Sequence, residues 1–254
     1  MKAFLTGLMV CFGISGSNAC AEVADTLANI KPAVVGIGTY QPLRNPRGQL
    51  KGTGFAVADG RHVVTCHHIV KSVLDIEKNE TWSVFLGQGR NIQYRPARKV
   101  VIDEDNDLVL LKIDGEPLPA LKIGKGISAR EGDQLYFTGY PIGSVLGLNA
   151  STHRAGLAAI VPIFTPLGQA GRLNARTIRQ AENPYQIFQL DAIAYPGNSG
   201  SPLWNPQTGE IMGVVNSVFV KGSKETALSD PSGISYAIPA SHISDLLKRA
   251  GLSQ

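Results

Sequence analysis

Residues 196–203 read PGNSGSPL and place Ser199 between Gly197 and Gly200, in a turn that joins two runs of β-type residues. Hydrolysis of an amide through a serine needs such a turn, because the hydroxyl must project while adjacent backbone N–H groups bind the oxyanion of the tetrahedral intermediate. Gly197 has no side chain to obstruct this turn, so the N–H groups of Gly197 and Ser199 are the candidate oxyanion donors. A glycine-rich serine turn is, on its own, more often only a turn. The hypothesis therefore requires a base and an acid elsewhere in the chain.

Histidines and aspartates beside two further β-type runs can supply that base and acid. A serine hydroxyl is too weakly acidic to attack unaided, so it needs a histidine and a carboxylate that orients the histidine. Residues 63–70 read VVTCHHIV, and residues 103–113 read DEDNDLVLLKI. The order histidine, aspartate, serine along the chain is that of chymotrypsin. This order predicts a serine hydrolase, with these candidates open on the residues alone: His67 or His68 as the base, and Asp103, Asp105 or Asp107 as the acid.

Short β-type runs separated by Gly, Pro, Asn and Asp fill most of the chain and predict an all-β fold. Six runs precede a seam at Pro117–Glu131, and six follow it. Helix signals appear only near the ends, at Glu22–Ile30 and at Ser241–Gly251, where Ser241 is the expected N-cap. The predicted strands are Ala33–Tyr40, Thr53–Ala58, His62–Cys66, Thr81–Leu86, Ala97–Asp103, Leu108–Ile113, Gln134–Gly139, Arg154–Pro162, Gln186–Leu190, Ser201–Trp204, Glu210–Phe219 and Gly233–Ile238.

The first 21 residues have the pattern of a secretory signal peptide, with a lone Lys2, an apolar run at Ala3–Ile14 and small residues at Ala19–Ala21. The apolar run is shorter than the roughly 20 residues that a membrane-spanning helix needs. We therefore predict an exported protein, periplasmic or secreted, with cleavage after Ala21 and no later segment that spans a membrane. Lipidation at Cys20 is the alternative processing event.

Charge and cysteine content narrow the possible partners and chemistry. The net charge is +4 at pH 7 without a run of Lys or Arg, which predicts no nucleic-acid partner. Cys11 and Cys20 fall within the predicted signal peptide. The mature chain would then retain only Cys66, so no internal disulfide is expected.

Five segments together resemble the protease domain of the HtrA/Deg group of trypsin-like peptidases. The segments are residues 51–55 (KGTGF), 64–70 (VTCHHIV), 107–113 (DLVLLKI), 197–203 (GNSGSPL) and 233–239 (GISYAIP). The resemblance covers about residues 22–250 and implies a chymotrypsin-like fold of two six-stranded antiparallel barrels, with the catalytic residues between them. It implies an N-terminal barrel within residues 22–125, and a C-terminal barrel within residues 126–254 that ends in the predicted helix.

Matched position by position, the resemblance implies a catalytic triad of His68, Asp107 and Ser199. The family motif places its base three residues after the threonine, which selects His68 and leaves His67 as a surface or wall residue. The family's acid directly precedes the apolar run, which selects Asp107. With this triad, the N–H groups of Gly197 and Ser199 stay the expected oxyanion donors, and the mechanism requires no metal ion and no organic cofactor.

The resemblance also locates a specificity pocket. In trypsin-like enzymes the residue six positions before the nucleophile forms the base of this pocket, and here that residue is Ile193. The walls would come from Asn216, Ser217 and Val218 and from the segment around Gly233. An apolar floor offers no partner for a buried charge. We therefore expect cleavage after small or medium uncharged residues.

Several features depart from the family pattern. Ser201 stands where most trypsin-like enzymes have glycine, although glutamyl endopeptidases share the GNSGSP form. Cys66 lies two residues before His68 and is expected to be a small buried packing residue. The chain ends soon after the last β-type run, so no PDZ domain is expected. The patternless segment Phe164–Tyr185 is long enough to have a function of its own.

The sequence thus predicts an exported serine endopeptidase that cleaves polypeptide substrates such as exported or misfolded proteins. Two alternatives stay open, namely a protease-fold protein that binds partners without cleaving them, and an esterase that uses the same triad. Labelling by a fluorophosphonate probe would separate an active enzyme from a scaffold. Turnover of peptides against esters would separate the two enzymes.

Overall fold

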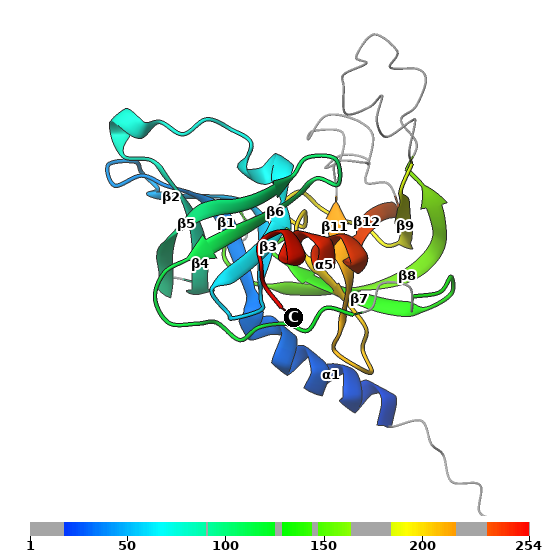
Figure 1. Cartoon of the computed structure of the whole chain (residues 1–254). Coiled ribbons are helices and arrows are strands. Elements are labelled where there is room, and N and C mark those ends of the chain that lie inside the picture. Colours follow the sequence, from blue (N-terminus) through cyan, green and yellow to red (C-terminus); the bar gives the residue numbers. More distant parts are fainter. Residues whose placement is uncertain are drawn as a thin grey trace, which may run out of the picture.

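Two closed six-stranded antiparallel barrels form the computed structural model of this chain (Figure 1). The structure describes residues 18–89, 91–124, 129–143, 147–163, 184–216 and 233–253. This architecture confirms the predicted all-β fold of two six-stranded barrels with a C-terminal helix. Residues 1–17, which hold most of the predicted signal peptide, and residues 164–183 of the patternless segment lie outside the described residues.

The first barrel has the strand order β1-β2-β3-β6-β5-β4. Its strand β6 is buried at every position except the half-buried Lys112, because one face lines the barrel and the C-terminal helix covers part of the other. Such double coverage explains why the strand is a nearly continuous apolar run. The bounds are β1 Val34–Tyr40, β2 Gly48–Val57, β3 His62–Cys66, β4 Thr81–Gln88, β5 Asn91–Asp103 and β6 Leu108–Ile113.

The second barrel has the strand order β10-β11-β12-β9-β8-β7. Each strand pairs antiparallel with its neighbours, and the short β10 begins three residues after Ser199. The bounds are β7 Gln134–Gly139, β8 Ser151–Pro162, β9 Gln186–Asp191, β10 Pro202–Trp204, β11 Ile211–Asn216 and β12 Ile234–Pro239.

Helices lie at the two ends of the described chain. Helix α1 spans Asn18–Ile30 and so begins four residues before the expected Glu22, while its end agrees with the prediction because Pro32 follows in a short 3₁₀ helix. Helix α5 spans Ala240–Arg249, with Pro239 at the N-cap and no side-chain capping bond. The prediction of Ser241 as N-cap was therefore wrong, since β12 runs directly into the helix. The 3₁₀ helices are η1 Lys31–Ala33, η2 His67–Val70 and η3 Ile76–Lys78.

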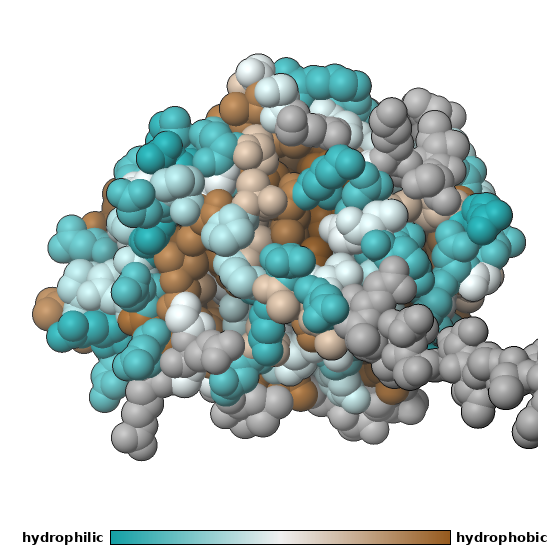
Figure 2. All heavy atoms as spheres, turned by 90° about the horizontal axis from the view of Figure 1, so that it is seen from below, coloured by the Kyte–Doolittle hydropathy of each residue, from teal (hydrophilic) through white to brown (hydrophobic). Residues whose placement is uncertain are grey.

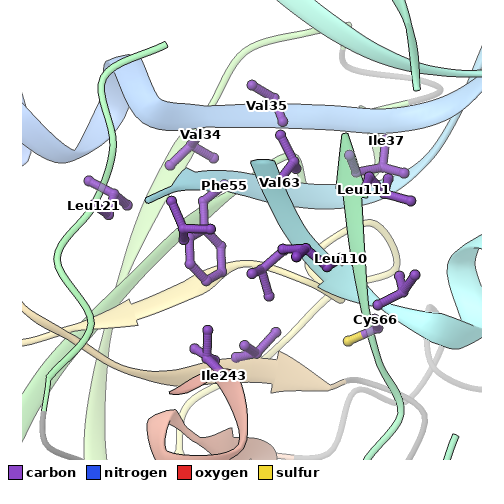
Figure 3. Packing of buried hydrophobic residues seen from close by; sticks show 14 of the residues in the cluster. Val34, Val35, Ile37, Phe55, Val63, Cys66, Leu110, Leu111, Leu121 and Ile243 are labelled. Carbon is purple, nitrogen blue, oxygen red and sulfur yellow. The ribbon is translucent and has the colours of Figure 1, made fainter. Parts of the chain in front are cut away.

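One hydrophobic cluster joins the two barrels and α5. It contains Phe55 and Leu110 of the first barrel, Trp204 and Val214 of the second, and Ile243 of α5, all buried. Figure 3 shows Phe55 and Leu110 on the side of the first barrel that faces Ile243. The apolar face of α5 thus packs where the barrels meet, which fixes one barrel against the other.

The surface is mixed in polarity. Figure 2 shows hydrophobic residues interspersed with hydrophilic ones on the face seen from below. Among the described residues, the large apolar side chains that are exposed are Leu43, Val73, Ile76, Val100, Ile102 and Ile234. None of the described helices has the length and apolar character needed to cross a membrane.

Truncation of one leucine tests whether α5 supports both barrels. Leu246 is fully buried and Leu43 is 94% exposed. Leu246→Ala should lower the free energy of unfolding by about 2–5 kcal/mol, because it removes buried methyl groups and leaves a cavity. The chemically identical control Leu43→Ala should change it by less than about 0.5 kcal/mol. Urea titration followed by fluorescence measures both values, and equal effects would contradict the described packing of α5.

Candidate active site

The pairing of β3 with β6 brings the predicted base and acid together. Cys66, the last residue of β3, lies opposite Leu108, the first residue of β6. Helix η2, which follows β3 and contains His68, is therefore adjacent to the turn that precedes β6 and contains Asp107. A backbone bond from the His67 N–H to the Asp107 carbonyl, at 2.9 Å, fixes this adjacency.

The carboxylate of Asp107 is buried and accepts three hydrogen bonds. Nδ1 of His68 lies 2.6 Å from Oδ2, the His68 backbone N–H donates to Oδ1 at 2.9 Å, and Nδ2 of Asn216 donates to Oδ2 at 2.8 Å. A carboxylate can only accept, so Nδ1 carries the ring proton and Nε2 is the acceptor nitrogen of the neutral ring. Hydrogen bonds to charged groups contribute about 1.5–3 kcal/mol each, which offsets the cost of burying the charge.

The competing acid Asp103 and the second histidine lie in other surroundings. Asp103 accepts from the backbone and side chain of Asn106, and its Oδ2 lies 3.4 Å from Nη1 of Arg249. It therefore braces its own turn and the end of α5. His67 is buried, so of the two expected positions the surface is wrong and the wall stays a prediction. Burial lowers the pKa of His67, because the charged imidazolium is desolvated there.

The turn around Ser199 has two positions, one on each side of the serine, that only glycine accommodates. The Asn198 N–H donates to the Tyr195 carbonyl at 2.9 Å, which closes a turn with Gly197 at φ +100°. A Cβ on Gly197 would lie 2.3 Å from the Tyr140 carbonyl oxygen, and one on Gly200, at φ +87°, would lie 1.9 Å from the Thr53 carbonyl oxygen. Larger residues are therefore excluded at both positions.

The Pro196–Gly197 peptide has a defined orientation. The Pro196 carbonyl accepts a bond from the Ile142 N–H at 2.7 Å. Because a trans peptide directs its N–H opposite to its C=O, the Gly197 N–H points away from Ile142 and from the loop that follows β7. A peptide rotated by half a turn would lose the bond to Ile142, so this contact stabilises the observed orientation.

Thr53 of β2 binds the serine turn to the first barrel, and sequence reasoning assigned it no role. Its N–H donates to the Ser199 carbonyl at 2.9 Å, and its Oγ1 donates to the Gly197 carbonyl at 2.7 Å. Its Oγ1 also accepts from the Tyr140 N–H at 3.0 Å. These bonds fix the turn of Ser199 relative to the barrel that carries His68. The motif KGTGF contained this signal, since a threonine between two glycines combines close backbone approach with a hydroxyl.

Two buried polar side chains follow the same turn. The side chains of Asn198 and Ser201 are fully buried. Among the described residues, neither the side-chain amide of Asn198 nor the hydroxyl of Ser201 has a hydrogen-bond partner. Ser201 is the residue that departs from the family pattern. It fits because residue 139 is glycine, since a Cβ there would lie 1.9 Å from the Ser201 Oγ.

The residues expected in the specificity pocket separate into three groups. Ile193 is partly buried, and its segment is fixed by Ser235, whose Oγ donates to the Ala192 carbonyl and accepts from the Ala194 N–H. Asn216 is fully buried and its Nδ2 donates to Asp107, so its side chain supports the acid, and its place in the pocket wall stays a prediction. Gly233 is exposed and directly precedes β12, while Ser217 and Val218 lie outside the described residues.

Cys66 is fully buried, as expected for a packing residue, and its Sγ lies 3.5 Å from the Val215 carbonyl oxygen of β11. In the part of the chain that the structure describes, one group of side chains has the composition and spacing to hold a metal ion. The group consists of Cys66, His68 and Asp107, whose candidate ligand atoms lie within 4.8 Å of one another.

Comparison with known proteins identifies the family of this chain. Residues 52–214 match the family model described as a trypsin-like peptidase domain. A probable periplasmic serine endoprotease, DegP-like, from Pseudomonas fluorescens is 29% identical over 84% of this chain and 39% of its own length. A protein of the same description from Chlamydia trachomatis is 32% identical over 81% of this chain and 35% of its own length. The chain thus spans less than two fifths of the length of these relatives.

A solved structure has the same fold. The HtrA-type protease AlgW, in a structure with a decapeptide, superposes with a TM-score of 0.65 over 90% of this chain and 67% of its own. The two sequences are 23% identical, so this likeness concerns the fold alone.

A glycine-to-alanine pair tests the packing between Gly139 and Ser201. Gly139→Ala should lower the free energy of unfolding by about 1–3 kcal/mol, because the added methyl overlaps the Ser201 hydroxyl. The same change made with Ser201→Gly should cost less, since the principal clash is gone. Gly156→Ala in β8 is the matched control, because the Cβ there would meet only the Asp191 Cβ at 3.7 Å. Denaturant titrations of these three variants and of Ser201→Gly alone measure the coupling, and additive effects would contradict it.

Proposed function

This chain belongs to the trypsin-like peptidase family, and from that membership we propose that it is a serine endopeptidase that cleaves polypeptides. The observation that carries the proposal is the network on Asp107. Of the two histidines that the sequence left open, His68 has its ring hydrogen-bonded to this carboxylate. Asp107 also binds Asn216 of the other barrel, whose neighbour Val215 accepts from the Gly200 N–H of the Ser199 turn.

In the proposed reaction, Ser199 Oγ attacks the scissile carbonyl while His68 Nε2 accepts its proton. Asp107 holds the ring with the proton on Nδ1 and stabilises the imidazolium that forms. The N–H groups of Gly197 and Ser199 bind the oxyanion, and His68 then returns the proton to the leaving amine. Water hydrolyses the acyl-enzyme by the same route. Thr53 supports this reaction as a positioning residue, because it holds the Ser199 turn against the barrel that carries His68.

The substrate proposal rests on the pocket floor and on the relatives. Ile193 provides an apolar base for the pocket, so cleavage is proposed after small or medium uncharged residues such as Val, Ala, Ile, Leu or Thr. The bacterial relatives are described as periplasmic endoproteases, and the AlgW structure contains a peptide. Together with the signal-like first 21 residues, they support an exported enzyme that acts on exported or misfolded polypeptides.

A fluorophosphonate probe tests the nucleophile. Ser199→Ala should abolish labelling and peptide turnover, because no hydroxyl remains for acylation, and its thermal unfolding should match that of the wild type. Ser201→Ala is the matched control, since it removes a serine hydroxyl two residues away and should retain labelling. Mass spectrometry of the labelled protein locates the adduct. Labelling of Ser199→Ala at the wild-type level would refute the assignment.

Substitution of Ile193 tests the pocket. Ile193→Asp should shift cleavage toward Lys and Arg before the scissile bond, because a carboxylate in the floor pairs with a buried cation. Ile193→Asn, which has the same size as the aspartate without its charge, should not produce this shift. Mass-spectrometric mapping of cleavage sites in a denatured protein library measures both preferences. Wild-type cleavage dominated by Lys, Arg or Glu at this position would overturn the proposal.

A further inference from the structure

The buried thiol of Cys66 lies against the base and the acid, yet the proposed reaction does not use it. Cys66 is the last residue of β3, and its Sγ, one ring nitrogen of His68 and one carboxylate oxygen of Asp107 lie within 4.8 Å of one another. Nδ1 is the ring nitrogen that faces Asp107, at 2.6 Å. A sulfur, a nitrogen and an oxygen donor therefore lie close to one another at the His68–Asp107 pair.

We propose that Cys66, His68 and Asp107 form an inhibitory binding site for a thiophilic divalent cation such as Zn²⁺ or Cd²⁺. Binding of the cation stands on the three side chains alone. Inhibition by the cation rests on the proposed function, because it requires His68 to act as the base.

The donor set and its spacing suit zinc. Zinc in proteins takes cysteine sulfur, histidine nitrogen and carboxylate oxygen, with bonds of about 2.0–2.3 Å and tetrahedral geometry. Two donors at such bond lengths and angles are about 3.5 Å apart. The three atoms, now within 4.8 Å, would need to rearrange by roughly an ångström. Rotation of the Cys66 and His68 side chains can supply movements of that size, with His68 as the partly exposed point of entry.

Charge balance favours a divalent cation in this buried position. Cys66 and Asp107 are buried, and an unbalanced charge there would be strongly unfavourable. A thiolate and a carboxylate together carry two negative charges, which a divalent cation cancels, while the imidazole stays neutral. A monovalent cation would leave a net negative charge among these residues.

The proton balance explains why binding would inhibit. The S–H bond of Cys66 breaks as the metal–sulfur bond forms, and one proton leaves to solvent. The ring proton of His68 moves from Nδ1, which becomes a ligand, to Nε2. A ring with its proton on Nε2 can no longer accept the proton of Ser199, and the bond from Nδ1 to Asp107 is lost. The metal would therefore stop acylation without touching Ser199, and a chelator would restore it.

Cadmium absorbance tests binding without any need for turnover. The full chain with Ser199→Ala is titrated with Cd²⁺. The absorbance of a thiolate-to-metal charge-transfer band should increase until one equivalent of Cd²⁺ has been added. Cys66→Ala and Cys66→Ser, each in that background, should lose the band and weaken calorimetric Zn²⁺ affinity by at least about 100-fold, because loss of a direct ligand exceeds the 10–100-fold seen for outer partners. In the uncleaved chain, which still contains the predicted signal peptide, Cys11→Ala with Cys20→Ala is the matched control and should retain both signals.

Two further readouts separate this site from adventitious zinc binding. Affinity should rise about tenfold per pH unit near neutrality, because one thiol proton is released for each metal bound. In the chain with Ser199 intact, Zn²⁺ should block fluorophosphonate labelling, EDTA should restore it, and Cys66→Ala should label with or without Zn²⁺.

Metal affinity that is unchanged in both Cys66 variants, or the absence of a thiolate band, would overturn the site. A band in a chain that never labels would sustain the site and refute the proposed function.

Discussion

The buried carboxylate of Asp107 is the constraint on which the arrangement of the site depends. Its charge lies in the interior, where it is tolerated only if donors surround it. Two of the donors come from His68 in the first barrel and one from Asn216 in the second. The requirement to satisfy one anion thus fixes the angle of a histidine ring and the distance between two barrels at once. Thr53 of the first barrel strengthens the same contact between the barrels, because it binds the turn of Ser199.

The sequence predicts strands where side-chain pattern and tertiary environment agree. Strands β3, β6 and β7 have the predicted bounds, because their apolar runs begin and end with the barrel core. Strands β2 and β5 extend beyond prediction into polar residues, whose backbones pair with neighbouring strands although their side chains are half-buried or exposed. Hydrogen bonding to a neighbour is a property of the partner strand, which local composition does not report.

The residues of the site also differ in whether local sequence or a tertiary contact determines their role. Its motif residues were visible in the sequence because glycine, histidine and aspartate at such spacings have few other uses together. The supporting roles of Thr53 and Asn216 were not visible, since each depends on a contact between segments more than 100 residues apart. Ser201 illustrates the converse. Its departure from the family pattern is evident in the sequence, but the glycine at position 139 that makes room for it is evident only in the fold.

The two barrels share one strand order. The first runs β1-β2-β3-β6-β5-β4, and six strands later the second runs β7-β8-β9-β12-β11-β10 around its closed sheet. Such a repeat is what duplication of a single six-stranded ancestor would leave behind. Neither copy now holds a complete set of the proposed catalytic groups, because the histidine and aspartate lie in one half and the serine in the other. Strands far from the contact between the barrels are free to diverge in sequence between the two halves. A substitution at that contact must still fit the facing residues of the other half, which descends from the same ancestral unit.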